Sequence, residues 1–296
     1  MSWQAELQAM GKMAANVPLA PRTTLGVGGE AAWLFRPSDK ANLIAAMSMI
    51  PQDISLFPLG RGSNVLIADS GIDGLVLDLG GINTLMVEGE TIKVGAGVRM
   101  SKLAQAAANH GLTGLEFMAT VPGDLGGGVA MNAGAFRQQV SDVLLSVDVL
   151  HRDGRLTCIS RDALDMRYRY TKLPQGALIV SATFKLETSD AEQIKTTMRE
   201  MRSKRSDSQP LALPNCGSVF KNPEGDFAAR LIESVGLKGE QRGKARISDV
   251  HANFIVNAGG ASSEDVLHLI RLAKAEVKKQ TNIDLEPEVK LVGCSL

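Results

Sequence analysis

Short apolar runs separated by glycines make up most of the sequence between residues 23 and 186. Runs of this length, bounded by residues that form turns, predict β-strands. Six are clear, at residues 65–68, 75–79, 92–94, 143–150, 156–159 and 178–186. Asp153-Gly154 between two of them predicts a hairpin, because a primed turn needs positive φ and glycine supplies it at little cost. The sequence therefore predicts that this part of the chain forms β-sheets.

Helical patterns become more frequent after residue 189. We expect helices at residues 39–49, 101–109, 191–205, 226–235 and 264–279. The last is the clearest, because its apolar residues fall on one face and Ser262 with Asp265 forms a capping box. Two prolines in residues 209–214 interrupt the helical pattern, so a domain boundary is expected near residues 189–214. The overall class is α+β.

Charge and chain length exclude several functional classes. The 296 residues suffice for roughly two domains. Lys+Arg and Asp+Glu both number 32, which leaves no excess charge to attract nucleic acid. No apolar run approaches the roughly 20 residues of a spanning helix, and the N-terminus lacks a secretory pattern, so a cytoplasmic protein without a membrane partner is expected. The three cysteines have no metal-ligand spacing and predict reduced thiols and no metal.

Three glycine clusters are candidates for holding phosphate, at residues 26–29, 60–64 and 123–128. None is a Rossmann or Walker loop, because the third glycine with its helix and the Gly-Lys-Ser/Thr sequence are both missing. The Gly-Arg-Gly-Ser-Asn loop could still present backbone N–H groups to a pyrophosphate, with Ser63 and Asn64 adding side-chain donors. Taken alone, it is more simply a tight turn between two strands.

Residues 114–135 are rich in glycine and alanine, which leaves the backbone accessible and allows it to approach a flat ligand closely. This segment implies a cofactor. Within it, Pro122-Gly123-x-x-Gly126-Gly127 through Met131-Asn132-Ala133-Gly134-Ala135 resembles the flavin-binding segment of the UDP-N-acetylenolpyruvoylglucosamine reductase family. Further blocks match in the same order, at residues 23–29, 60–66, 168–169, 217–223, 251–257 and 286–289.

The resemblance implies an α+β fold in which a two-part FAD-binding unit of the vanillyl-alcohol-oxidase (PCMH) type carries a smaller α/β substrate-binding domain. The expected boundaries are 1–77 for the first FAD-binding subdomain, with 287–296 returning to it, 78–203 for the second, and 204–286 for the substrate domain. It further implies non-covalent FAD, NADPH as co-substrate, a nucleotide-sugar substrate and a monomer of the shorter subtype that lacks the inserted substrate loop.

The resemblance also assigns catalytic roles. Hydride addition to an alkene conjugated with a carboxylate drives negative charge onto the carboxyl group, so the site needs a cation there and a proton donor at the neighbouring carbon. Ser218 aligns with the proton donor and Arg169 with the carboxylate-binding cation. Glu288 would stabilise the enolic intermediate, hydrogen bonding in its protonated form.

Binding residues are implied in the same way. For the cofactor they are Gly60, Arg61, Gly62, Ser63, Asn64, Pro122, Gly123, Gly126, Gly127, Asn132, Ala133 and Gly134. For the substrate they are Tyr168, Lys221, Asn222 and His251. A locally placed lysine such as Lys221 is what a neutral protein must use to meet a diphosphate. His251 and Asn253 lie beside the apolar residues 254–256, and packing explains both as well as function does.

The chain departs from the family pattern at three positions. Thr171 and Leu173 stand where a serine and an aromatic residue are usual, and Cys216 stands two residues before Ser218. The sequence leaves open whether a thiol there makes activity sensitive to oxidation. Two rival functions remain open: an oxygen-using flavin oxidase of the same superfamily, and a nucleotide-sugar binding or regulatory protein that keeps the scaffold. Neither rival explains why all three catalytic positions are occupied.

Overall fold

The computed structural model describes residues 2–296, which form two compact units. Unit 1 contains the N-terminal segment through Ala15 together with Trp33–Gly60 and Gly74–Arg205, and unit 2 contains Asn16–Ala32, Arg61–Asp73 and Ser206–Leu296. The last boundary falls within the region expected from the prolines. Residues 16–32 and 61–73, which we expected in the first FAD-binding subdomain, cluster with the C-terminal part instead. The three-part division stays a prediction.

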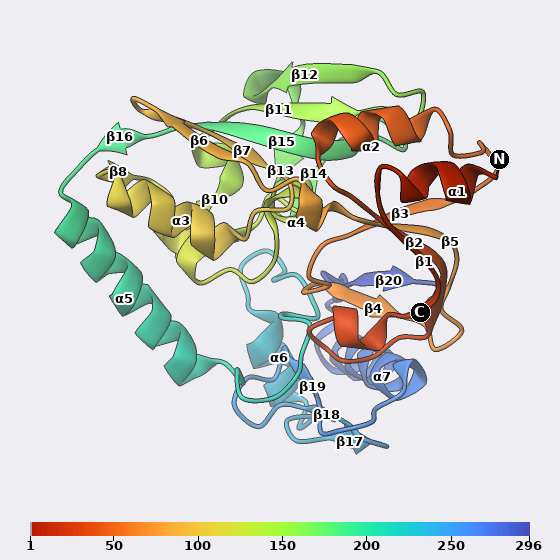
Figure 1. The fold of residues 1–296 in the computed structure, drawn as a ribbon. Coiled ribbons are helices and arrows are strands. Elements are labelled where there is room, and N and C mark those ends of the chain that lie inside the picture. Colours follow the sequence, from red (N-terminus) through yellow and green to blue (C-terminus); the bar gives the residue numbers. More distant parts are fainter. Residues whose placement is uncertain (1) are drawn as a thin grey trace. The chain divides into compact units, whose positions relative to one another are not determined.

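A five-stranded antiparallel sheet organises unit 1, in the order β12-β11-β15-β7-β6 (Figure 1). Its strands are β6 (Leu85–Glu88), β7 (Thr91–Gly95), β11 (Leu144–Leu150), β12 (Leu156–Ser160) and β15 (Leu178–Lys185). The predicted hairpin joins β11 to β12, and Gly154 in its turn has φ +83°. The core beneath includes Phe117, Val147 and Phe184, all fully buried.

The helices of unit 1 follow the predicted pattern, with two additions, the first and the fourth helix. They are α1 (Trp3–Gln8), α2 (Lys40–Met47), α3 (Met100–Asn109), α4 (Leu125–Ala130) and α5 (Ala191–Ser208), the last of which ends beyond the unit boundary. We expected residues 123–128 to form a loop, yet most of them form helix α4, which packs against β15. Glycine is a poor helix former, and tertiary packing overrides that propensity here.

The smaller strands belong mainly to unit 1, and three of them extend by two or three residues into the chain segments of unit 2. A four-stranded sheet has the order β1-β2-β5-β3, with strands Gly11–Pro18, Glu30–Pro37, Ile72–Asp78 and Leu56–Leu59. Two hairpins matter below, β9–β10 (Gly134–Ala135 with Gln138–Gln139) and β13–β14 (Met166–Arg167 with Tyr170–Thr171). Strands β8 (Leu112–Thr113) and β16 (Glu187–Thr188) also pair.

Unit 2 combines two helices with short strands. Helices α6 (Ala228–Ser234) and α7 (Ser263–Thr281) contact each other, and α7 packs against β17 (Gln241–Arg242) and β18 (Ala245–Ile247), the latter paired with β19 (Ile255–Asn257). The predicted capping box of Ser262 and Asp265 begins α7. Strand β20 (Lys290–Val292) runs parallel to β4 (Val65–Ile67), which brings the C-terminal segment back to the N-terminal part of the chain.

Asp148 on strand β11 bonds to side chains of strand β15 and helix α2. These bonds should make the free energy of unfolding depend on pH. The Asp148 carboxylate accepts hydrogen bonds from Ser181 at 2.6 Å and Lys40 at 3.0 Å, and Lys93 lies at 3.3 Å. Burial alone would raise the pKa of Asp148, but the bonds from Ser181 and Lys40 and the two lysine charges outweigh it and lower the pKa from 3.8 to about 2. The folded state therefore favours the charged carboxylate.

We expect the Asp148→Asn protein to lose about 2 kcal/mol of unfolding free energy at neutral pH. Because the folded-state pKa is the lower one, the contribution of Asp148 is present above pH 4 and is lost as the pH falls towards 2. Urea unfolding of wild type and variant at several pH values measures the difference. Glu90→Gln removes a surface pair with Lys185 and should change little. A constant wild-type-to-variant difference down to pH 2 would contradict the assignment.

Candidate active site

In unit 1, hydrogen bonds join the glycine-rich segment at residues 122–135 to hairpin β13–β14. Side chains of both the segment and the hairpin donate them. Asn132 is fully buried, and its amide donates to the Gln139 side chain at 3.1 Å and to the Arg167 carbonyl at 3.0 Å. Its side-chain oxygen accepts from the Ser141 N–H at 2.9 Å. Because the Asn132 side chain is engaged with protein, any contact with a cofactor would come from its backbone.

Two of the three residues that depart from the family pattern, Thr171 and Leu173, lie in this region. Thr171 is buried and donates from Oγ1 to the Val129 carbonyl at 2.6 Å, which fastens hairpin β13–β14 to helix α4. Leu173 packs against the main core of unit 1. The hydroxyl at position 171 therefore holds the scaffold, and an aliphatic side chain at 173 is accommodated by ordinary packing.

Left-handed backbone conformations concentrate in these hairpins. Six non-glycine residues among residues 2–296 have positive φ, and four of them belong here: Asn132 (42°), Phe136 (54°), Arg137 (63°) and Arg169 (55°). Such conformations cost energy for residues with a Cβ atom, and they persist where the surrounding structure imposes them. Arg169 is held further by a 3.0 Å bond from Nη2 to the Gly134 carbonyl. Its guanidinium lies over the exposed ring of Tyr168, 4.9 Å from the centroid.

The glycines of this segment serve different purposes. A Cβ on Gly126 would lie 3.1 Å from Ala96, one on Gly128 only 2.4 Å from the Met100 sulfur, and one on Gly134 only 2.3 Å from the Gln138 carbonyl oxygen. Gly123 has φ +115°. At Gly127 a Cβ would meet nothing within 4 Å, although the residue is exposed in the middle of α4, where glycine is unfavourable. Only Gly127 lacks an explanation within the protein.

In unit 2, Ser218 and Glu288 belong to two segments that run side by side. The Val219 carbonyl accepts from the Glu288 N–H at 2.8 Å and from the Val289 N–H at 3.2 Å. Two residues further along, the Lys221 N–H donates to the Glu286 carbonyl at 2.9 Å. Phe220 and Pro287 form the antiparallel bridge between these bonds. Two blocks separated by nearly 70 residues in sequence thus bring the backbone at Ser218 close to the backbone at Glu288.

Two asparagines hold these segments in place. Asn253 is buried and bonds the backbone of Phe220 twice, accepting from its N–H at 2.9 Å and donating to its carbonyl at 2.8 Å. Its own carbonyl accepts from the Val219 N–H at 2.9 Å. Asn64 donates to the Glu288 carbonyl at 3.1 Å. Asn253 therefore positions the backbone next to Ser218, a role the sequence left open. Asn64 positions the Glu288 backbone, and its expected contact with a pyrophosphate stays a prediction.

The loop at residues 60–64 begins in unit 1 and ends in unit 2. A Cβ on Gly60 would lie 3.0 Å from an Asp124 carboxylate oxygen. Gly62 has φ +58°, and a Cβ there would meet the Arg22 carbonyl oxygen at 2.7 Å. Thr24 donates from its N–H to the Gly62 carbonyl at 3.1 Å. The glycines at 60 and 62 are thus required by the protein's own packing; Arg61 is exposed and Ser63 half-buried.

The expected substrate-binding residues of unit 2 are less uniform. Lys221 pairs through Nζ with Glu286 at 2.6 Å, and Asn222 accepts from the Ala228 N–H at 3.0 Å at the start of α6. His251 accepts from the Asn253 N–H at 3.3 Å and packs edge-on against Phe254, with ring centroids 4.9 Å apart. Burial lowers the pKa of His251, so the ring is neutral near pH 7. The structure favours packing for His251.

The sequence left open whether Cys216 is reactive, and its burial answers the question. The thiol is 1% exposed, and burial, with a smaller contribution from the Glu288 charge, raises its pKa to about 12. Because the thiolate is the reactive form, a buried protonated thiol is inert at neutral pH. All three cysteines are free; Cys158 is exposed and Cys294 half-buried.

Titration of the native protein with a chromogenic disulfide reagent should therefore show one fast thiol, Cys158, a slower one, Cys294, and no reaction of Cys216 until the protein unfolds. The Cys158→Ser variant should lose only the fast phase. A third thiol that reacts without denaturant would contradict the burial of Cys216.

Two family models match the chain. One describes the C-terminal domain of UDP-N-acetylenolpyruvoylglucosamine reductase and matches residues 209–292, and the other describes an FAD binding domain and matches residues 31–160. The second contains the glycine segment and hairpin β9–β10, and the first contains Ser218, Asn253 and Glu288. Within residues 2–296, every helix is too short or too polar to traverse a lipid bilayer.

Relatives share most of the chain. The UDP-N-acetylenolpyruvoylglucosamine reductase of Alkalilimnicola ehrlichii is 42% identical over 277 residues, covering 93% of each chain, and that of Bacillus subtilis is 41% identical over 288 residues, covering 96% of this chain and 95% of the relative. The crystal structure of the Thermus caldophilus enzyme superimposes with a TM-score of 0.81 at 35% identity, over 95% of this chain and 98% of the other. These matches confirm the α+β fold class with an FAD-binding domain, and the chain belongs to the UDP-N-acetylenolpyruvoylglucosamine reductase family of flavin-dependent oxidoreductases.

Proposed function

We propose that this protein uses NADPH and non-covalent FAD to reduce the enolpyruvyl group of UDP-N-acetylglucosamine-enolpyruvate to UDP-N-acetylmuramate, a precursor of peptidoglycan. The observation that carries the proposal is the pairing of the Ser218 and Glu288 segments through the Val219 carbonyl. It supports a proton donor and a carboxyl group acting on one substrate. Family membership supplies the class of reaction.

Residues of unit 1 fit a flavin. Gly127 leaves an open position on α4 that no protein atom explains, and the Gln138 side-chain oxygen is buried without a hydrogen-bond partner among residues 2–296. The N–H and hydroxyl groups of a flavin could donate a hydrogen bond to the Gln138 oxygen. Its flat ring could lie against the backbone at Gly127, where no side chain intervenes. We expect the backbone of residues 122–134 to line the FAD site. When bound, FAD takes two electrons from a nicotinamide and delivers them as hydride to the alkene.

Three side chains of the protein stabilise the negative charge of the reacting substrate and supply its proton. As hydride adds to the alkene, negative charge develops on the conjugated carboxyl group, and Arg169 offers a planar guanidinium to pair with it. Ser218 donates a proton from its hydroxyl to the neighbouring carbon. Glu288, in its protonated form, donates a hydrogen bond to the developing enolic oxygen. Asn253 and Asn64 keep the backbones of the Ser218 and Glu288 segments fixed.

Lys221 and Asn222 are proposed to meet the diphosphate. The Lys221 side chain is 20% exposed and pairs with Glu286, whose own side chain is 69% exposed. A mobile surface carboxylate is a weak partner, so a diphosphate with its higher charge can replace or share it. This exchange allows the protein to hold a charged ligand while its net charge is zero.

The test follows the flavin spectrum of the purified holoenzyme. We expect a yellow protein that bleaches with NADPH under anaerobic conditions and recovers its colour only when the enolpyruvyl nucleotide-sugar is added. Recovery with oxygen alone at a catalytic rate would favour the oxidase alternative. A protein that takes up no FAD, or that binds the nucleotide-sugar without reducing it, would overturn the proposal.

A further inference from the structure

Phe227 is the most exposed of the large hydrophobic side chains in residues 2–296, at 66% of its surface. A lone exposed apolar residue is common and by itself indicates nothing. What distinguishes Phe227 is its surroundings. Unit 2 contains only three aromatic side chains of the Phe, Tyr or Trp type, and the other two, Phe220 and Phe254, are 1% and 2% exposed. Phe227 is the one such ring that unit 2 offers to a ligand.

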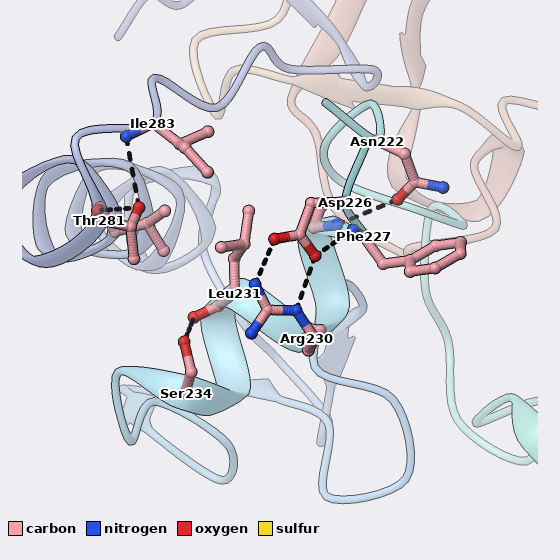
Figure 2. Close-up of polar contacts among 10 residues, drawn as sticks. Asn222, Asp226, Phe227, Arg230, Leu231, Ser234, Thr281 and Ile283 are labelled. Carbon is pink, nitrogen blue, oxygen red and sulfur yellow. Dashed lines mark hydrogen bonds and ion pairs between the residues drawn. The ribbon is translucent and has the colours of Figure 1, made fainter. Parts of the chain in front are cut away.

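Hydrogen bonds fix the backbone that carries this ring. The Phe227 N–H donates to Asp226 Oδ1 at 2.7 Å, and Arg230, one turn into α6, binds the same carboxylate through Nε at 2.7 Å and through Nη2. Figure 2 shows Asp226 between Phe227 and Arg230, with the phenyl ring extending away from this pair. The ring is therefore presented on a rigid support and is not part of the packing of α6.

The same network ties Phe227 to the proposed diphosphate site. Asn222 Oδ1 accepts from the N–H of Ala228, the residue after Phe227, at 3.0 Å (Figure 2). The Asp226 N–H donates to the Pro223 carbonyl at 3.3 Å. These two bonds close the loop from Asn222 to Ala228, so Phe227 is held near Asn222 although four residues separate them in the sequence.

The order of groups along unit 2 matches the order of groups in a nucleotide-sugar. Ser218 and Glu288 lie at one end of the paired segments. Lys221 lies three residues beyond Ser218, about 10 Å along extended chain, and is paired with Glu286. A substrate whose enolpyruvyl group reaches Ser218 and whose diphosphate reaches Lys221 directs its ribose and base beyond Lys221. The loop that Asn222 closes follows Lys221 directly in the sequence, so it is the next segment of unit 2 that could contact the base.

We propose that the Phe227 ring is the platform on which the uracil of the nucleotide-sugar stacks. This inference rests on the proposed function and names the residue that receives the base in a chain expected to lack the inserted substrate loop. Stacking on an aromatic face suits every base and requires no hydrogen-bond donor. Phe227 therefore provides affinity for the nucleotide and leaves base identity to other groups.

The experiment compares Phe227→Ala, Phe227→Trp and Leu211→Ala holoenzymes. Leu211 is another exposed apolar side chain of unit 2. Its replacement by alanine therefore controls for the loss of exposed apolar surface alone. We expect Phe227→Ala to raise the KM for the enolpyruvyl nucleotide-sugar, and the Kd for UDP, by about tenfold, the effect of losing one base–aromatic stack. Phe227→Trp should retain wild-type values or improve them, and Leu211→Ala should match wild type.

Two further measurements test whether Phe227 contacts the uracil base specifically. One uses pyrophosphate, which has no base, and the other uses NADPH, the second nucleotide that the enzyme is proposed to bind. Inhibition by inorganic pyrophosphate, which has no base, should be the same in wild type and Phe227→Ala. The rate and KM for flavin reduction by NADPH should also be unchanged. An equal loss of pyrophosphate affinity, or a raised KM for NADPH in place of the nucleotide-sugar, would overturn the assignment to uracil.

Failure of this inference can be told from failure of the proposed function. If wild-type protein reduces the enolpyruvyl nucleotide-sugar and Phe227→Ala does so with an unchanged KM, the stacking proposal is wrong and the function stands. If wild-type protein does not reduce that substrate, the function itself is wrong, whatever Phe227 does.

Discussion

Replacement of Ser218 by alanine is expected to separate the two halves of the reaction. Reduction of bound FAD by NADPH should proceed at the wild-type rate, because that step needs no proton from Ser218. Reoxidation by the enolpyruvyl nucleotide-sugar should slow by about 10²- to 10⁴-fold, the usual contribution of a positioned general acid. Anaerobic stopped-flow absorbance of the flavin measures both rates independently.

A matched control is available on the same unit. Ser234 lies at the end of α6 and donates to the Leu231 carbonyl at 2.8 Å, so Ser234→Ala removes a hydroxyl without touching the proposed site. It should leave both rates unchanged. If Ser218→Ala reoxidised as fast as wild type, Ser218 would not be the proton donor. If both half-reactions slowed together, Ser218 would hold the cofactor or the backbone rather than supply a proton.

The elements predicted with success are those whose signals are local. The apolar run at 178–186 became β15, and Ser262 with Asp265 began α7 as the capping box requires. Helix α4 was missed because its glycines oppose helix formation in isolation, whereas packing of α4 against β15 supplies the stabilisation. Strand β1 was missed because its residues from Gly11 to Pro18 do not form an apolar run.

The contacts of the candidate site were harder to predict from sequence than the helices and strands. The ordered motifs identified Ser218 and Glu288, but the contacts that position them join residues far apart in sequence. Asn253 reaches Phe220 across 33 residues, and Asn64 reaches Glu288 across 224. Phe227 carried no motif at all. Its significance lies in its exposure and in the bond between Asn222 and Ala228, which only the folded chain reveals.

Glycine content was the feature most open to misinterpretation. We took the glycines at 28, 29, 126 and 128 as places where backbone approaches FAD. In the structure, a Cβ on Gly29 would lie 2.1 Å from the Asp69 carbonyl oxygen, and one on Gly128 would collide with Met100. These glycines allow close packing of protein against protein, and their expected approach to FAD stays a prediction. What a missing side chain makes room for depends on tertiary contacts, so sequence alone cannot distinguish the two uses.

Gly127 and Gly128 are adjacent in α4, yet substitutions at the two positions should act in opposite ways. A Cβ at Gly127 meets nothing, so Gly127→Ala should stabilise the apoprotein by about 0.5–1 kcal/mol through the better helix propensity of alanine. A Cβ at Gly128 would lie 2.4 Å from the Met100 sulfur, so Gly128→Ala should destabilise the apoprotein by about 1–3 kcal/mol. Thermal unfolding of the FAD-free proteins measures both.

The larger effect is expected from Gly127→Leu on cofactor binding. If the open position at Gly127 is where flavin meets the backbone, a leucine there occupies space that the cofactor needs, and the Kd for FAD should rise about ten- to a hundredfold, the cost of overpacking by a few methylenes. Quenching of FAD fluorescence on titration with apoprotein measures this Kd without any turnover. The fold should survive, because leucine is a good helix former and no protein atom lies within 4 Å of the added Cβ. An unchanged Kd for FAD in a folded Gly127→Leu protein would place the flavin elsewhere and leave the glycine at 127 without a reason.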